Sequence, residues 1–276
     1  MKFRAVIRDS LSIKDFFNIV TTLSKCGKDV IFNALPDRLA VAVNVDSPQT
    51  ALPMWCDLEK TVFFAEYVMD GLSESHNAII LIMKAANLVR VLSGSRNSET
   101  SYLKLKLMSK NIACLCLEME IPSSTSAASR RISHDVPVMV VSRRDWLQYQ
   151  LPSLPDFEMT VGVPGVRSIG GIIEAMRESS TVMSVQTVRN GTVSFISESP
   201  MAKISCHCRN QDVFAQGESE KITCKIESRR LALFLANSQL PCTDMRCSIS
   251  EGHLVKFEVK VQDKVIMTCV IPATTE

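Results

Sequence analysis

The sequence predicts an α+β protein of two similar domains, each with antiparallel sheets and two helices. Its 276 residues suit two domains of ordinary size, each able to bury a core of its own. In the first half, short β-rich runs alternate with two helical segments. The same order of strand, helix and strand returns in the second half, which indicates an internal duplication.

The first half opens with a predicted strand at residues 3–8 and an amphipathic helix at 12–26. Apolar side chains recur along this helix at Ile13, Phe16, Phe17, Val20 and Leu23. We expect Ser12 to cap the helix and Gly27 to end it. A second helix is predicted at 85–92, directly after a strand at 78–83. Other strands are predicted at 30–34, 38–45, 52–58, 62–68, 102–107, 112–121 and 132–141.

The second half repeats this order. A predicted strand, helix and strand at 159–163, 166–179 and 182–188 match the opening of the chain. A second such set at 221–227, 229–237 and 245–249 matches the later part of the first half, and strands at 255–261 and 265–271 close the chain. The predicted domains are therefore 1–144 and 159–276. The intervening residues 145–158, which contain Pro152 and Pro155, are predicted to connect them.

Composition describes an ordered globular protein, with 46% hydrophobic and 22% charged residues. The longest apolar runs are far shorter than the roughly 20 residues of a membrane-spanning helix, so we expect neither a membrane anchor nor a secretory signal. Ten cysteines in a chain of this kind predict reduced thiols in the cytoplasm or nucleus. With a net charge of only +2, any contact with an anionic polymer depends on where the basic residues lie.

The cysteine pairs raise the question of a metal site. Cys206 and Cys208 flank His207, but on a strand the two thiols point to one face and the imidazole to the other. The spacing of two intervening residues that structural zinc sites use is missing there and at Cys114 and Cys116. We expect these cysteines to be buried apolar side chains, and we predict no metal or cofactor.

Catalytic motifs are equally scarce. His134 and Asp135 form the one local histidine and acid pair, and the chain has four histidines in all. Neither a nucleophile elbow nor a phosphate-binding loop is present. We therefore predict that the chain is not an enzyme. A thiol- or zinc-dependent hydrolase remains an alternative, which stoichiometric zinc would favour.

Several short motifs together resemble the Hus-one checkpoint family. They are MKFRA at 1–5, MWCDLE at 54–59, RISHDVP at 131–137, RRDW at 143–146 and VIPA at 270–273. They span the chain from end to end, and their joint occurrence is specific although no single motif is. Hus-one is a relative of the replicative sliding clamp, and the duplicated order of strands and helices is the pattern of a clamp.

The resemblance implies a DNA-clamp fold, with antiparallel sheets outside and two helices of each domain on the inner surface. It implies a heterotrimer with two Rad-type paralogues, loaded by an ATP-driven clamp loader around double-stranded DNA at damage sites. Such a ring acts as a scaffold for checkpoint kinase activation through a checkpoint mediator and for repair enzymes. It implies the nucleus, with the cytoplasm as a second compartment. A homotrimeric replicative clamp is the alternative within the same fold.

Helices that line a clamp should carry basic residues on their solvent faces, because phosphate attraction holds DNA without reading its sequence. Eight basic side chains lie on or beside the four predicted helices, against acidic Asp15, Glu174 and Glu178. The basic residues are Lys14, Lys25, Arg90, Arg96, Arg167, Arg177, Arg229 and Arg230. The alternative is that these residues merely form the solvent-exposed face of ordinary amphipathic helices.

Subunit contacts in a ring should come from unpaired edge strands. By resemblance, these are the strand at 132–141 in the first domain and residues 202–208 in the second. Pro137 shortens the first, since proline cannot donate a backbone hydrogen bond. The expected interface residues are Ile132, His134, Val136, Val138, Val140, Ile204, Cys206 and Cys208. Alternatively, both segments are internal strands of a monomer.

The connector carries more apolar residues than a solvated linker needs. We therefore expect part of it to pack against a domain and to form one wall of a groove for partner proteins. The predicted groove residues are Trp146, Leu147, Leu151, Leu154, Val270, Ile271 and Pro272.

Overall fold

The computed structural model describes residues 1–43, 53–95, 100–109, 111–122, 129–217, 219–237, 242–261 and 264–274, and the chain divides into two compact units. Unit 1 consists of Met1–Ala51 and Trp55–Leu151. Unit 2 consists of Leu52–Met54 and Pro152–Glu276, so the division falls inside the predicted connector. Within the described residues, no helix has the length and apolar character needed to cross a membrane.

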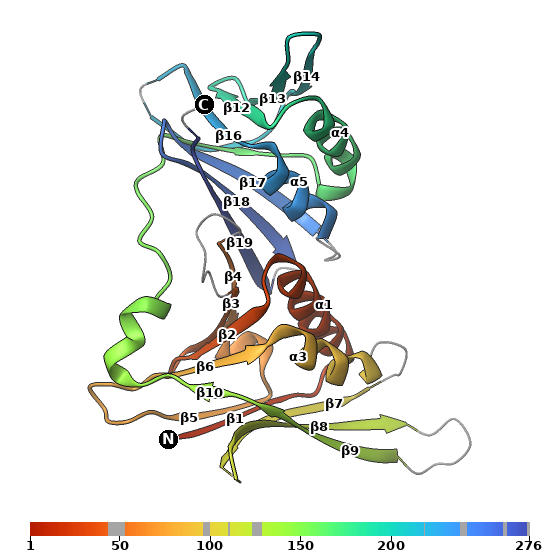
Figure 1. The fold of residues 1–276 in the computed structure, drawn as a ribbon, viewed down its shortest axis with the longest axis vertical. Helices are drawn as coiled ribbons and strands as arrows, with labels where there is room; N and C mark the ends of the chain where they lie inside the picture. Colours follow the sequence, from red (N-terminus) through yellow and green to blue (C-terminus); the bar gives the residue numbers. More distant parts are fainter. Residues whose placement is uncertain are drawn as a thin grey trace. The chain divides into compact units, whose positions relative to one another are not determined.

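Unit 1 contains ten strands, three α-helices and two short 3₁₀ helices among its described residues. In chain order they are β1 (Lys2–Ile7), α1 (Ser10–Cys26), β2 (Asp29–Ala34), β3 (Arg38–Val43), β4 (Met54–Glu59), α2 (Lys60–Phe63), β5 (Glu66–Asp70), β6 (Ile79–Lys84), α3 (Ala85–Leu92), η1 (Ser93–Ser95), β7 (Tyr102–Ser109), β8 (Ala113–Pro122), β9 (Ser129–Pro137), β10 (Met139–Val140) and η2 (Arg143–Tyr149). Helices α1 and α3 pack side by side (Figure 1).

Unit 2 repeats this order without α2, β10 and the 3₁₀ helices. Its elements are β11 (Met159–Gly162), α4 (Val166–Ser179), β12 (Val182–Val188), β13 (Thr192–Glu198), β14 (Lys203–Cys208), β15 (Val213–Gln216), β16 (Lys221–Glu227), α5 (Ser228–Asn237), β17 (Cys242–Ser250), β18 (Leu254–Val261) and β19 (Val265–Pro272). Helices α4 and α5 form the second pair (Figure 1).

The strand orders of the two units are the same, as expected of a duplication. In unit 1 one sheet runs β5-β1-β7-β8-β9, and in unit 2 its counterpart runs β15-β11-β17-β18-β19. The second sheet of unit 1 runs β4-β3-β2-β6-β10, and its counterpart runs β14-β13-β12-β16. The neighbouring strands whose registers are described pair antiparallel.

The helix pairs bury one face of their sheets. Phe16 on α1 meets Phe32 on β2 edge to face, with ring centroids 6.2 Å apart. In unit 2, Phe234 on α5 packs on Phe257 of β18 at 6.1 Å. The five apolar residues predicted to face the core from the first helix are all buried. Because successive residues of a strand point to opposite faces, each sheet also has a second face that no helix of its pair covers.

Three local predictions were wrong. Asp9, not Ser12, caps α1, because its carboxylate accepts hydrogen bonds from the amides of Leu11 and Ser12 and from the Ser12 hydroxyl. Residues 62–68, predicted as one strand, contain the end of α2 and the start of β5, because apolar runs this short fit either structure. Residues 132–141, predicted as one strand, form the end of β9 and the separate short strand β10, which pair with different sheets.

The cap gives a direct test. We expect Asp9→Ala to lower the free energy of unfolding by about 1 kcal/mol, because two amides at the start of α1 lose their acceptor. Asp9→Asn keeps a side-chain acceptor, so its free energy of unfolding should fall by less than half as much. Ser12→Ala serves as the control, since it leaves the amide hydrogen bonds to Asp9 in place. Urea denaturation of the three variants decides, and an equal loss in Ser12→Ala would contradict the assignment.

Candidate functional site

The helices present basic side chains to solvent in both units. Lys14 and Lys25 on α1 and Arg90 on α3 are exposed, as are Arg167 on α4 and Arg229 on α5. Each helix buries its opposite face in the core. These five cations therefore remain available for an anionic partner.

Other basic residues of the predicted set are less available to bind an anionic partner. Arg177 pairs with Glu174 one helical turn earlier at 2.5 Å, which offsets its charge locally. Asp15 is only 4% exposed, so this acidic residue contributes little to the solvent face of α1. Arg96 lies outside the described residues.

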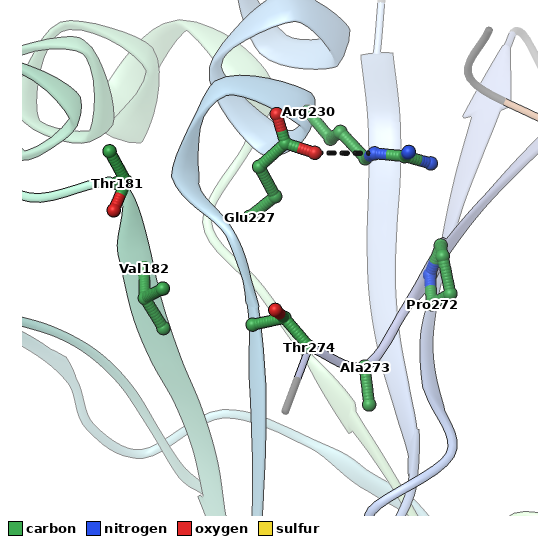
Figure 2. Close-up of a pocket in the computed structure, with 7 residues that line it drawn as sticks. All are labelled: Thr181, Val182, Glu227, Arg230, Pro272, Ala273 and Thr274. Carbon is green, nitrogen blue, oxygen red and sulfur yellow. Dashed lines mark hydrogen bonds and ion pairs between the residues drawn. The ribbon is translucent and has the colours of Figure 1, made fainter. Parts of the chain in front are cut away.

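Arg230 belongs to a different environment. Its Nε donates to Glu227 Oε2 at 2.8 Å, and only 14% of its side chain is exposed (Figure 2). It lines a cavity of about 440 Å³ together with Thr181, Val182, Glu227, Pro272, Ala273 and Thr274. Arg230 is therefore a poorer candidate for a contact with phosphate than its neighbour Arg229.

The C-terminal segment at this cavity extends the duplication. Ala273 forms an antiparallel bridge with Ile226 of β16, and the amide of Thr274 donates to the Lys225 carbonyl at 2.9 Å. In unit 1 the counterpart of β16 is β6, which pairs with β10 in the same way. The segment after β19 thus repeats the path that the chain takes after β9.

Strand β9 is an edge of its sheet. Ile132, His134 and Val136 lie on one face of it, opposite Met119, Leu117 and Leu115 of β8. Ile132 is 36% exposed and His134 is exposed, whereas Val136 belongs to the core at 1%. Val138 and Val140 are half-buried, Val138 between the two strands and Val140 on β10.

Strand β14 is likewise an edge, next to β13. Ile204 is 37% exposed, Cys206 is half-buried and Cys208 is buried at 8%. Both predicted interface strands therefore have apolar side chains that shift from exposed to buried along their length. Val136 and Cys208 are core residues that can support an interface without forming its contact surface.

A buried apolar cluster lies on the second face of a unit 1 sheet. It consists of Ile31, Ile80, Ile82 and Val141. Ile31 lies on this second face because successive residues of a strand point to opposite faces. Its neighbours on β2, Val30 and Phe32, are buried on the other face, where Phe32 meets α1. Ala42, Trp146 and Tyr149 pack against this set, which we call the outer cluster. The predicted connector thus does pack on a domain, through η2.

The corresponding face of unit 2 is polar. In unit 1, Ile31 pairs with Ile82 two residues beyond the Asp29 and Lys84 pair. At the same step in unit 2, Ser184 pairs with Lys225, and Gln186 with Thr223 follows. No apolar cover is needed there, because these side chains can be solvated.

The remaining groove residues differ widely in exposure. Leu147 is 79% exposed and Pro272 is exposed, whereas Leu151 and Leu154 are half-buried. Val270 is 6% exposed and Ile271 is fully buried in the core of unit 2. Ile271 therefore has no surface to offer a partner. Met139 on β10 was missed by the sequence reading, and it is 55% exposed and pairs with Ile82.

No catalytic or metal-binding constellation is found among the residues that the structure describes. No group of three metal-ligating side chains comes together there. The His134 imidazole faces the side of Leu117, and Asp135, the next residue of the strand, faces the other side. The sequence did not reveal one serine and histidine pair, in which Ser194 Oγ lies 2.8 Å from His207 Nδ1. Ser194 is only 3% exposed.

Comparison with solved structures shows the fold. The chain matches the proliferating cellular nuclear antigen of Entamoeba histolytica with a TM-score of 0.73 over 99% of both chains, at 12% identity. The likeness confirms the predicted DNA-clamp fold, with its duplicated domains of sheets and paired helices.

The family follows from the sequence. The model of the Hus1-like protein family matches residues 1–275, so the chain belongs to this family, and the resemblance to Hus-one is confirmed. It is 29% identical to checkpoint protein HUS1 of Homo sapiens and 28% identical to checkpoint protein Hus1-like of Drosophila melanogaster, each over 99% of both chains. A Dictyostelium discoideum homologue is 25% identical over 74% of this chain and 72% of its own.

The thiols can be tested by alkylation. Burial, and secondarily the neighbouring Cys206, raises the pKa of Cys208 from 9.0 to about 11. At pH 8 its thiolate should be about 100-fold scarcer than that of an unperturbed thiol, and alkylation should be slower to match. We expect the rate to climb with pH up to about 11, measured by peptide mass spectrometry. Cys206→Ser is the control: because burial dominates, Cys208 should stay slow, and fast labelling would contradict this.

Proposed function

We propose that this checkpoint clamp subunit joins two Rad-type paralogues in a ring around double-stranded DNA at damage sites. A dedicated ATP-driven loader places the ring, which works as a nuclear scaffold for a checkpoint mediator and repair enzymes and performs no catalysis itself. Membership of the Hus1-like family over residues 1–275 is the observation that carries this proposal. It favours the heterotrimer over a homotrimeric replicative clamp.

The DNA contact is assigned to the exposed cations of the helices. Five long basic side chains are exposed on the solvent faces of the helices: Lys14, Lys25, Arg90, Arg167 and Arg229. Such side chains attract phosphates without reading bases, so a ring held by them can slide. Arg177 and Arg230 contribute less, because each is paired with a glutamate.

The subunit contacts are assigned to the edges β9 and β14. An unpaired edge offers a row of backbone donors and acceptors to a neighbouring strand. Ile132 and His134 on β9, and Ile204 and Cys206 on β14, would add side-chain contact to that pairing. Pro137 ends β9, opposite Cys114, and is followed by Val138, whose amide donates to the Ala113 carbonyl.

Client proteins are assigned to the surface around η2 and β10 in unit 1. Exposed Met139 pairs with Ile82 of the outer cluster, and exposed Leu147 follows half-buried Trp146 on η2. Leu151, the last residue of unit 1, remains a proposed part of this surface by its position in the connector, and Leu154 and Pro272 remain proposed client contacts of unit 2.

Charge reversal tests the DNA contact. We expect Lys14→Glu, Arg90→Glu and Arg229→Glu together to abolish retention of the assembled ring on closed circular DNA. The slope of log affinity against log salt should fall by about 3, because three phosphate contacts are lost.

The matched control places the same charge change on sheet faces, as Lys106→Glu, Lys221→Glu and Lys225→Glu, all exposed residues. Retention should persist in that variant. Equal loss in both variants would show that net charge, not the helices, holds the DNA.

Assembly tests the edges. We expect Ile132→Asp or Ile204→Asp to weaken assembly with the two paralogues at least ten-fold, because a carboxylate would be buried without a partner at the interface. Both side chains are about one-third exposed, so the monomer should still fold. Ile266→Asp, on a strand and 50% exposed, is the control. Gel filtration of the mixtures measures the effect, and unchanged complexes with both edge variants would refute the assignment.

A further inference from the structure

We propose that Trp146 is an internal occupant of the client site, and that a client binds by inserting an aromatic side chain in its place on the outer cluster. The inference rests on the proposed client surface of unit 1 and adds how that surface is regulated. Each chain would present the site closed, and binding would require the indole to leave.

The first argument is the position of the indole. Ile31, Ile80, Ile82 and Val141 form an apolar patch on a sheet face that no helix of the pair covers. Such a patch left open would be a binding or aggregation surface. Trp146 closes it together with Tyr149, and both come from the 3₁₀ helix η2.

The second argument is that the cover is weakly held. The indole Nε1 donates to the Val141 carbonyl at 3.3 Å, beyond the usual range for such a bond. A 3₁₀ helix has poor internal hydrogen-bond geometry, and η2 begins without a side-chain cap. Its hydrogen bond between Ser142 and Asp145 lies in the turn itself and fixes nothing to the sheet.

The third argument is that exposed apolar side chains beside η2 offer a client its first contact. Met139 pairs with Ile82 across the strands and leaves 55% of its surface exposed, and Leu147 is 79% exposed. An incoming apolar side chain can therefore contact this surface before the indole moves. The early contact partly offsets the cost of opening the turn.

The chemistry of the client follows from the present occupant. A place that packs an indole ring against isoleucine and valine favours a flat apolar ring over a branched or polar side chain. Among the described residues, the matching positions of unit 2 carry Ser184, Lys225, Gln186 and Thr223 in place of the isoleucines. The inference therefore gives one such site for each chain.

Fluorine NMR tests the displacement on the unmodified chain. The protein has two tryptophans, so 5-fluorotryptophan gives two signals, which Trp146→Phe assigns. The probes are the capped peptide Gly-Leu-Phe-Leu-Gly and its Gly-Leu-Ser-Leu-Gly counterpart. We expect the first to shift the Trp146 signal toward that of solvated tryptophan and the second to shift neither signal. Trp55, which is 8% exposed, should stay in place with both.

Removal of the occupant supplies the second measurement. If the indole covers the cluster more than about nine-tenths of the time, Trp146→Ala should bind the phenylalanine peptide at least ten-fold more tightly. This variant should also bind 3-methylindole, which the unmodified chain should not. Gln148→Ala, exposed on the same 3₁₀ helix, is the matched control and should bind neither probe more tightly than the unmodified chain does.

The outcomes separate the two ideas. Peptide binding that leaves the Trp146 signal unmoved, or that Trp146→Ala weakens, would overturn the occupant inference and keep the client surface. Absence of peptide binding to both the unmodified chain and Trp146→Ala would overturn both. Neither result bears on the ring, which assembly and DNA retention test.

Discussion

The whole structure depends on the burial of one sheet face by a pair of helices, carried out twice. Phe16 against Phe32 and Phe234 against Phe257 mark these interfaces in the two units. Once the helices have used their apolar faces on the sheets, only three surfaces remain for function: the wet faces of the helices, the sheet edges and the second faces of the sheets. The proposed DNA, subunit and client contacts each use one of these surfaces, so they can change independently.

The duplicated fold leaves the two units free to differ on the second faces of their sheets. The strand orders are equal, so the core of each unit is constrained in the same way. The second sheet faces carry no such constraint. Isoleucine pairs with isoleucine at Ile31 and Ile82 in unit 1, whereas Ser184 pairs with Lys225 at the matching step of unit 2. The apolar pair requires a cover, which the chain supplies from η2. The polar pair is stable in water.

Much of the fold could be predicted from the sequence, because helical periodicity and the repeat are local signals. The spacing from Ile13 to Leu23 identified the core face of α1, and the ion pair of Glu174 with Arg177 could be read from its spacing. Sheet order and the path of η2 could not be predicted in this way, since they depend on contacts distant in the sequence. The outer cluster joins Ile31 to Val141, and only the folded sheet brings them together.

The charges at the two edge strands bear on the choice between identical and different ring partners. β9 begins with exposed Arg130 and Arg131, and exposed Arg209 directly follows β14. If β9 of one copy paired antiparallel with β14 of another, the start of β9 would meet the end of β14. Arg130 would then approach Arg209, a like-charge contact that opposes association, whereas the charge of Arg131 is offset by Glu120 at 3.8 Å. A paralogue with a neutral or acidic edge avoids this cost. At this end of the edge strands, charge therefore disfavours the pairing of identical copies.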